Sequence, residues 1–199
     1  IRKVLERLLL KGNIVVKKAY CNWERYKEFK GGMHEAGFEL IEIPHVRMSG
    51  KNSADIRMVV DALDLCYTKE HVDTFVVVSG DSDFSPLVAK LRENNKIVVG
   101  CGVKNSTSDL LINACDAFIY YDDLVRGEQK TRVARREKSA KSATKAPGGA
   151  EERRQEGIDL MLETAEDLFA ERDVEEKVWG SMVKQAIKRR KPGFNESYY

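Results

Sequence analysis

The sequence predicts an α/β protein whose sheet is mainly parallel, followed by a small helical module. Up to residue 125, short runs of β-branched and aromatic residues alternate with helical stripes, the pattern of βαβ units. One such run, Phe75 to Val78, ends in a turn that carries Asp81 and Asp83. After a basic stretch without apolar periodicity come two further helical stripes. We therefore expect right-handed crossovers and an acidic loop at the carboxyl edge of the sheet.

The first elements follow directly from apolar spacing. Apolar residues recur at helical intervals from Ile1 to Leu9, and Gly12 is placed to end that helix. A strand, a helix and a second strand are then expected over residues 14–20, 25–36 and 38–43. A polar turn precedes the next helix, for which Ser53 has the side chain of an N-cap.

The second half repeats the alternation. Phe75 to Val78 indicates a buried strand, and Pro86 suits the first turn of the helix that follows. A strand, a short helix and a last strand are expected over residues 96–100, 106–114 and 117–120. With the helix from residue 53, these elements close the predicted domain near residue 125.

The acidic turn after residue 78 has two interpretations. Open α/β sheets bind ligands at the carboxyl ends of their strands, where Asp81 and Asp83 fall. Two carboxylates so close are costly to hold together unless a cation lies between them. A capped helix with solvated Asp side chains explains the same residues. Asp55 likewise has a purely structural explanation, because a negative charge in a first helical turn suits the helix dipole.

Composition limits the possible classes of protein. The chain has 199 residues, 42% of them hydrophobic, and a formal net charge of +2. No apolar run approaches the roughly 20 residues of a membrane span, and the first residues do not resemble a signal peptide. The chain also lacks a starting Met, so upstream residues are expected. We interpret the scattered cysteines as reduced thiols of a cytosolic protein: Cys21, Cys66, Cys101 and Cys115.

Several catalytic and nucleotide-binding patterns are excluded. Gly100 and Gly102 lack the third glycine of a dinucleotide-binding fingerprint, because Asn105 stands in its place. The sequence also has no phosphate-binding GxxxxGK[ST] loop and no GxSxG nucleophile motif.

The C-terminal part separates into a linker and a module. Residues 126–145 hold eight Lys and Arg against two Glu, and the stretch 126–150 is predicted to be a flexible basic linker. Residues 151–199 form two helical stripes, one on Ile158, Met161, Leu162, Ala165, Leu168 and Phe169, the other from Val178 to Ile187. Such a pair with a basic end is typical of a helix-turn-helix or winged-helix module. A plain two-helix cap with solvated charges remains the alternative.

Four sequence elements resemble the NYN family of PIN-like ribonuclease domains. They are residues 51–55 (KNSAD), 61–65 (DALDL), 79–84 (SGDSDF) and 114–119 (ACDAFI), in the family's order and at fitting intervals. The resemblance covers residues 1–125 and implies a three-layer PIN-like fold. It further implies an acidic pocket that binds Mg²⁺ or Mn²⁺ and cleaves RNA phosphodiester bonds. Ligands that are all oxygen atoms suit such a hard cation.

The resemblance assigns roles to particular residues. Asp55, Asp81 and Asp83 match the acidic positions and are the expected metal ligands and catalytic residues. Asp61 matches another recurrent position, but it lies six residues past Asp55, about 240° around the helix, so we expect a supporting role. Lys51 and Asn52 are expected to hold the RNA backbone. The family's first strand, which carries a further Asp, would precede Ile1.

The C-terminal stretch resembles the OST-HTH/LOTUS module that some NYN proteins carry. On that basis Lys184, Lys188, Arg189 and Arg190 are expected to bind RNA. The sequence thus predicts a metal-dependent ribonuclease, expected to be an endonuclease, with an appended RNA-binding module. Two alternatives stay open: an RNA-binding protein that cleaves poorly, and an adaptor that recruits a protein partner, or a second copy, through its C-terminal helices.

Overall fold

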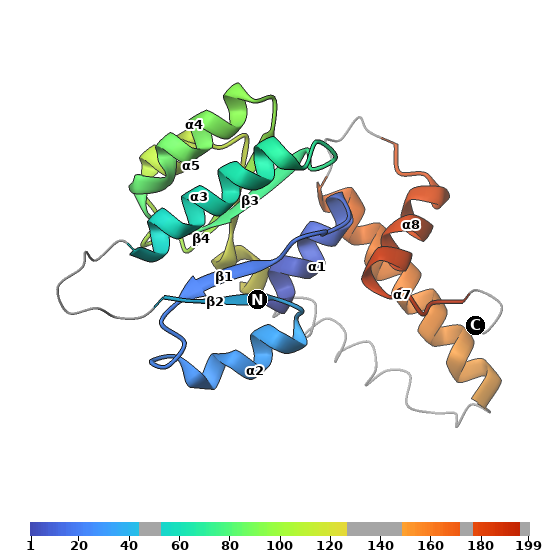
Figure 1. The fold of residues 1–199 in the computed structure, drawn as a ribbon. Helices are drawn as coiled ribbons and strands as arrows, with labels where there is room; N and C mark the ends of the chain where they lie inside the picture. The colour runs from blue at the N-terminus through green and yellow to red at the C-terminus, as the bar shows by residue number, and fades with distance from the viewer. Residues whose placement is uncertain (44–52, 127–148, 172–176, 196–199) are drawn as a thin grey trace. The chain divides into compact units, whose positions relative to one another are not determined.

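The structure, a computed structural model, describes residues 1–43, 53–126, 149–171 and 177–195 (Figure 1). The chain divides into two compact units. The first contains Ile1 and residues 15–129, and the second contains residues 2–14 and 130–199. Within the described residues, no helix is both long enough and apolar enough to cross a membrane.

The described residues of the first unit form two parallel sheets. Strand β1 (Lys18–Cys21) pairs with β2 (Glu39–Glu42), and Lys18 lies opposite Glu39. Strand β4 (Ile97–Gly102) lies between β3 (Thr74–Val78) and β5 (Ala117–Tyr120), parallel to both. The expected mixed α/β fold with parallel strands is confirmed, and it is consistent with a PIN-like fold.

Helices connect these strands and form the core with them. They are α2 (Lys27–Glu35), α3 (Ser53–Thr68), the 3-10 turn η1 (Ser82–Phe84), α4 (Ser85–Glu93) and α5 (Asp109–Ala114). Cys66 from α3, Leu87 and Leu91 from α4 and Leu111 from α5 pack with Phe75 and Val98 of the sheet. This core packs α3 and β3 together, the two elements that position the acidic residues discussed below.

Two strands differ from the sequence-based expectation. The first begins at Lys18 rather than at residue 14, because its partner β2 starts at Glu39 and offers no backbone to residues 14–16. In β3, Phe75 and Val77 are buried but Val76 and Val78 are exposed. The core cluster covers only one face of β3, so the strand alternates instead of being buried throughout.

The second unit joins the beginning of the chain to its end. Helix α1 (Arg2–Lys11) packs with α7 (Gly149–Glu171) and α8 (Gly180–Arg190). Leu10 of α1 shares a core with Leu168 of α7 and with Val183, Ala186 and Ile187 of α8. The described part of this unit is helical and holds no strand, so the winged-helix architecture stays a prediction.

Candidate metal-binding acidic site

A short turn fixes Asp81 and Asp83 just beyond β3. Oδ1 of Asp81 accepts the Asp83 backbone N–H at 3.0 Å, and the Asp81 N–H donates to Oγ of Ser79 at 3.1 Å. The Phe84 side chain, 4% exposed, anchors the turn in the core. Asp81 thus caps η1 while both carboxylates stay exposed to solvent.

A close backbone approach explains the glycine in this turn. A Cβ on Gly80 would collide with the Ser106 carbonyl oxygen and would lie 3.2 Å from Cα of Thr107. The Ser108 N–H donates to the Gly80 carbonyl at 2.9 Å. The loop after β4 is therefore packed directly on the loop after β3, at the carboxyl edge of the sheet.

This packing also brings Asp109 toward the same edge. Asp109 is exposed in the first turn of α5, directly after Ser108, whose side chain caps that helix. Sequence reasoning did not select Asp109. The available signal was its position at the start of the helix after a strand, the position that Asp83 occupies one strand earlier.

Asp55 of α3 belongs to the same electrostatic environment. Burial raises the pKa of its carboxyl group, and the negative charges of Asp81 and Asp83 raise it further. The structure therefore brings Asp55, Asp81 and Asp83 within electrostatic reach of one another. Burial and the two neighbouring charges therefore oppose the stabilisation that a helix N-terminus offers to an ionised Asp55.

The carboxylates of Asp55, Asp81 and Asp83 are chemically suitable ligands for a hard divalent cation. All three side chains offer carboxylate oxygens, the ligands that Mg²⁺ and Mn²⁺ prefer, and a cation would relieve their repulsion. Among the described residues, however, no group of three or more His, Cys, Asp and Glu side chains is arranged to hold a metal ion. The identity of the metal ligands stays a prediction.

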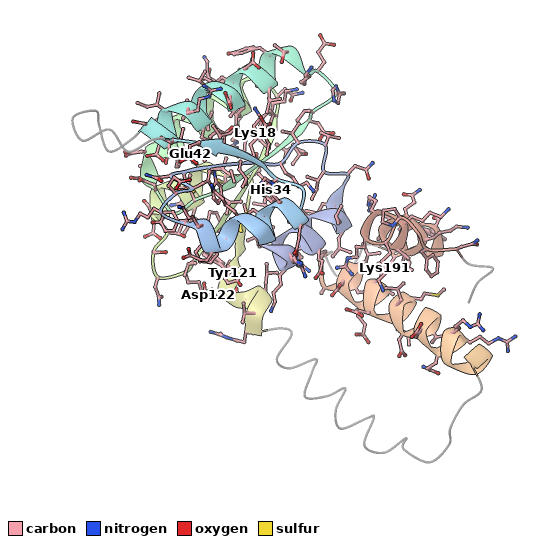
Figure 2. All side chains as sticks on the ribbon, turned by 60° about the horizontal axis from the view of Figure 1, so that its bottom comes forward. Lys18, His34, Glu42, Tyr121, Asp122 and Lys191 are labelled. Atoms are coloured by element: carbon pink, nitrogen blue, oxygen red, sulfur yellow. The ribbon has the colours of Figure 1, made fainter. Side chains whose placement is uncertain are left out.

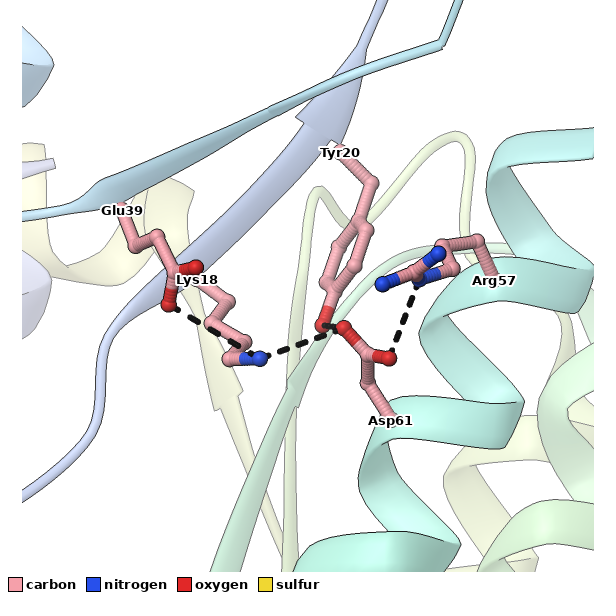
Figure 3. A network of polar contacts seen from close by, with 5 residues as sticks. All are labelled: Lys18, Tyr20, Glu39, Arg57 and Asp61. Atoms are coloured by element: carbon pink, nitrogen blue, oxygen red, sulfur yellow. Dashed lines mark hydrogen bonds and ion pairs between the residues drawn. The ribbon is translucent and has the colours of Figure 1, made fainter.

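Asp61 lies in a separate network (Figure 3). Its Oδ2 accepts hydrogen bonds from Nζ of Lys18 at 3.2 Å and from the hydroxyl of Tyr20 at 3.0 Å. Nε of Arg57 lies 3.0 Å from Oδ1. Lys18 also pairs with Glu39 of β2 at 3.7 Å. The network ties α3, the helix that carries Asp55, to β1 and β2.

The pKa directions in this network show which interactions dominate. Burial alone would raise the pKa of Asp61, but the hydrogen bonds from Lys18 and Tyr20 and the nearby cationic charges hold it below its usual value. Burial and the hydrogen bond to Asp61 raise the pKa of Tyr20, so its hydroxyl keeps its proton. Both oxygens of Asp61 are thus engaged by β1 and by Arg57, which suits the supporting role expected for it.

Other carboxylates near the strand ends have structural partners. Glu42, labelled in Figure 2, accepts the Trp23 backbone N–H at 3.1 Å, and Asp122, also labelled there, accepts that of Lys104 at 2.8 Å. Asp116, from the ACDAFI element, accepts the Val98 N–H at 2.8 Å and pairs with Arg92. That element therefore joins β4 to β5.

The residues expected to bind RNA differ in whether the structure describes them and in whether they have structural partners. Lys51 and Asn52 lie outside the described residues, as does most of the basic linker. Lys184 and Lys188 are exposed on α8. Arg189 donates to the carbonyls of Leu9 and Leu10, and Arg190 pairs with Asp167 at 2.7 Å. Those two arginines therefore connect α8 to α1 and α7.

Comparisons with known proteins identify a family for the first part of the chain. A family model described as "NYN domain" matches residues 1–122. A Methanocaldococcus jannaschii protein, "Uncharacterized protein MJ0482", is 30% identical over 119 residues, covering 60% of this chain and 45% of that protein. The chain thus spans less than half of that relative. A crystal structure from Vibrio parahaemolyticus, "a protein of unknown function VPA0982", has a TM-score of 0.51 at 30% identity, covering 60% of this chain and 78% of that one.

Proposed function

The chain belongs to the NYN domain family, and from this premise we propose that it is a metal-dependent ribonuclease that hydrolyses RNA phosphodiester bonds. NYN domains are PIN-like nucleases with RNA-related functions. One observation carries the proposal: burial and the charges of Asp81 and Asp83 act together on Asp55 at the carboxyl edge of the sheet. Repelling carboxylates held on a rigid core are the arrangement expected of a cation site.

The described residues support distinct tasks in this proposal. Asp55, Asp81 and Asp83 would hold Mg²⁺ or Mn²⁺. When bound, the cation would neutralise the scissile phosphate and lower the pKa of the attacking water. The Asp83 N–H holds the Asp81 side chain in one orientation before any ligand arrives. Asp61 would act as a positioning residue through its contacts with β1.

Replacing Asp81 in the intact protein tests the proposal. Asp81→Asn should lower single-turnover RNA cleavage about 100-fold or more with Mg²⁺ or Mn²⁺ supplied, because it removes a charge that would contact the cation. Asp123→Asn is the matched control, since Asp123 is an exposed carboxylate that pairs with Lys104 at 2.8 Å. Equal cleavage by Asp81→Asn and wild type would contradict the proposal. RNA binding without cleavage by the wild type would favour the RNA-binding alternative.

The C-terminal unit is proposed to act as an OST-HTH/LOTUS-like module. The sequence resemblance and the exposure of Lys184 and Lys188 on α8 support this proposal. The contribution of this unit to RNA affinity can be measured by filter binding, independently of cleavage.

A further inference from the structure

Helix α7 has two apolar faces, and only one of them is buried. Thr164 and Leu168, exposed by 0% and 5%, lie on the face that packs within the second unit. A second face carries four large apolar side chains that are each 51–60% exposed. We call this face the outer stripe; its residues are Ile158, Met161, Leu162 and Phe169.

The outer stripe is one continuous surface. Its members follow the i, i+3, i+4, i+11 spacing of a single helix face, about 100° wide. Half-buried Ala165 lies between them on the same face. From Ile158 to Phe169 the stripe is about 16 Å long, or three helical turns. A contiguous exposed apolar surface of this kind marks an interaction site more often than scattered single residues do.

The charges beside the stripe discriminate between occupants. Asp159, Glu163 and Glu166 follow one long edge of it, on the side away from the buried face. These carboxylates would repel RNA phosphates. If two copies of the stripe packed antiparallel, their acidic edges would lie against each other and repel. If they packed parallel, the acidic edge of each copy would meet the side of the other α7 that its own unit already covers.

The remaining occupant is a helix of complementary charge. We propose that the outer stripe of α7 binds an amphipathic helix of another protein, about three turns long, whose apolar face is bordered by Lys or Arg. Apolar anchors at helical spacing would pack between Leu162 and Phe169, and the basic border would face Asp159 and Glu166. This surface assigns a protein-binding role to the second unit, independent of the proposed ribonuclease activity.

Synthetic peptides of defined pattern test the proposal on the full chain. The probes are three fluorescein-labelled peptides of about five helical turns. The first has a Leu stripe bordered by Lys, the second replaces Lys by Glu, and the third scrambles the first. In fluorescence anisotropy, the Lys-bordered peptide should bind with a Kd at least about tenfold lower than the other two. Equal binding of the Lys-bordered and scrambled peptides would overturn the proposal.

Variants of the stripe localise the binding. Leu162→Ser/Phe169→Ser should raise the Kd of the Lys-bordered peptide about tenfold or more, whereas Val60→Ser should leave it unchanged. Val60 is a suitable control because it is 56% exposed on α3 of the other unit. Circular dichroism checks that the double variant folds. Unchanged binding by a folded double variant would refute the assignment to the outer stripe.

A charge reversal gives a second, independent measurement. Asp159→Lys/Glu166→Lys should invert the preference, so that the Glu-bordered peptide binds more tightly than the Lys-bordered one. Retention of the original preference would contradict the proposed orientation of the charges. Sedimentation of the wild type gives the remaining outcome: a dimer that Leu162→Ser/Phe169→Ser dissociates would show that a second copy covers the stripe, and would overturn the proposal.

Discussion

The guanidinium of Arg189 donates to the carbonyl oxygen of Leu10 at 2.8 Å, although the two residues lie 179 positions apart. It also donates to Leu9 at 2.8 Å. The last carbonyls of a helix have no partner within it, so Arg189 caps α1. Arg7 and Lys11 of α1 reinforce this union by pairing with Glu171 of α7. These contacts therefore attach α1 to α7 and α8.

Arg189→Ala should destabilise the second unit by about 1–3 kcal/mol, because it leaves the end carbonyls of α1 without their charged donor. Lys188→Ala, an exposed neighbour on the same helix, should change the stability by no more than about 0.5 kcal/mol. Urea unfolding followed by circular dichroism measures both. Similar stabilities for the two variants would contradict the capping role.

RNA affinity should depend on the exposed lysines. Lys184→Ala/Lys188→Ala should weaken binding and lower the slope of log K against log salt by about 1.4 for single-stranded RNA, if each lysine contacts one phosphate. Gln185→Ala serves as a control, because Gln185 is an exposed, uncharged residue on the same helix. Filter-binding titrations over several salt concentrations give the slope. An unchanged slope would leave α8 without a role in binding RNA.

Asp61→Asn should destabilise the first unit by about 1–3 kcal/mol at neutral pH, because the cationic groups of Lys18 and Arg57 lose their counter-charge. The pKa of Asp61 is lower in the folded protein than in the unfolded one, so its contribution is present above about pH 4 and is lost as the pH falls through the folded value. The variant should therefore show a weaker loss of stability in acid. Asp64→Asn, on an exposed position of α3, should keep the wild-type pH profile.

Asp55→Asn should stabilise the metal-free protein at pH 7, by no more than about 1 kcal/mol, because it removes a carboxylate that burial and two neighbouring charges disfavour. Adding Mn²⁺ at ten times its Kd should stabilise the wild type by about 1.4 kcal/mol and the variant by less. Thermal unfolding with and without Mn²⁺ provides both comparisons. A destabilised metal-free variant would show that the helix dipole outweighs the repulsion.

Gly80→Ala should destabilise the first unit by about 1–3 kcal/mol and reduce cleavage, because the new Cβ collides with the Ser106 carbonyl and must displace the acidic turn. Gly31→Ala is the matched control: a Cβ there meets nothing within 4 Å, and alanine favours helix α2. Equal Tm values and cleavage rates for both variants would indicate that the loop after β4 can shift to accommodate the new Cβ.

The sequence alone was sufficient to predict the features that depend on residues close together in the chain. Alternating strand and helix patterns predicted the parallel α/β class, and the strand ending at Val78 placed Asp81 and Asp83 at a carboxyl edge. Capping by Asp81 is similarly local, since its partner is the N–H of Asp83. Such features involve neighbouring residues, so composition and periodicity report them directly.

Tertiary structure alone decided which of the candidate residues meet and which faces are buried. Asp61 contacts Lys18 and Tyr20, more than 40 positions earlier, and Arg189 reaches α1 from the other end of the chain. On α7, helical periodicity places Leu168 in one stripe with the four residues of the outer stripe, but the structure buries Leu168 together with Thr164 and leaves the other four exposed. Periodicity shows that a helix has an apolar face, whereas burial depends on which partners pack against it, and those partners come from distant parts of the chain.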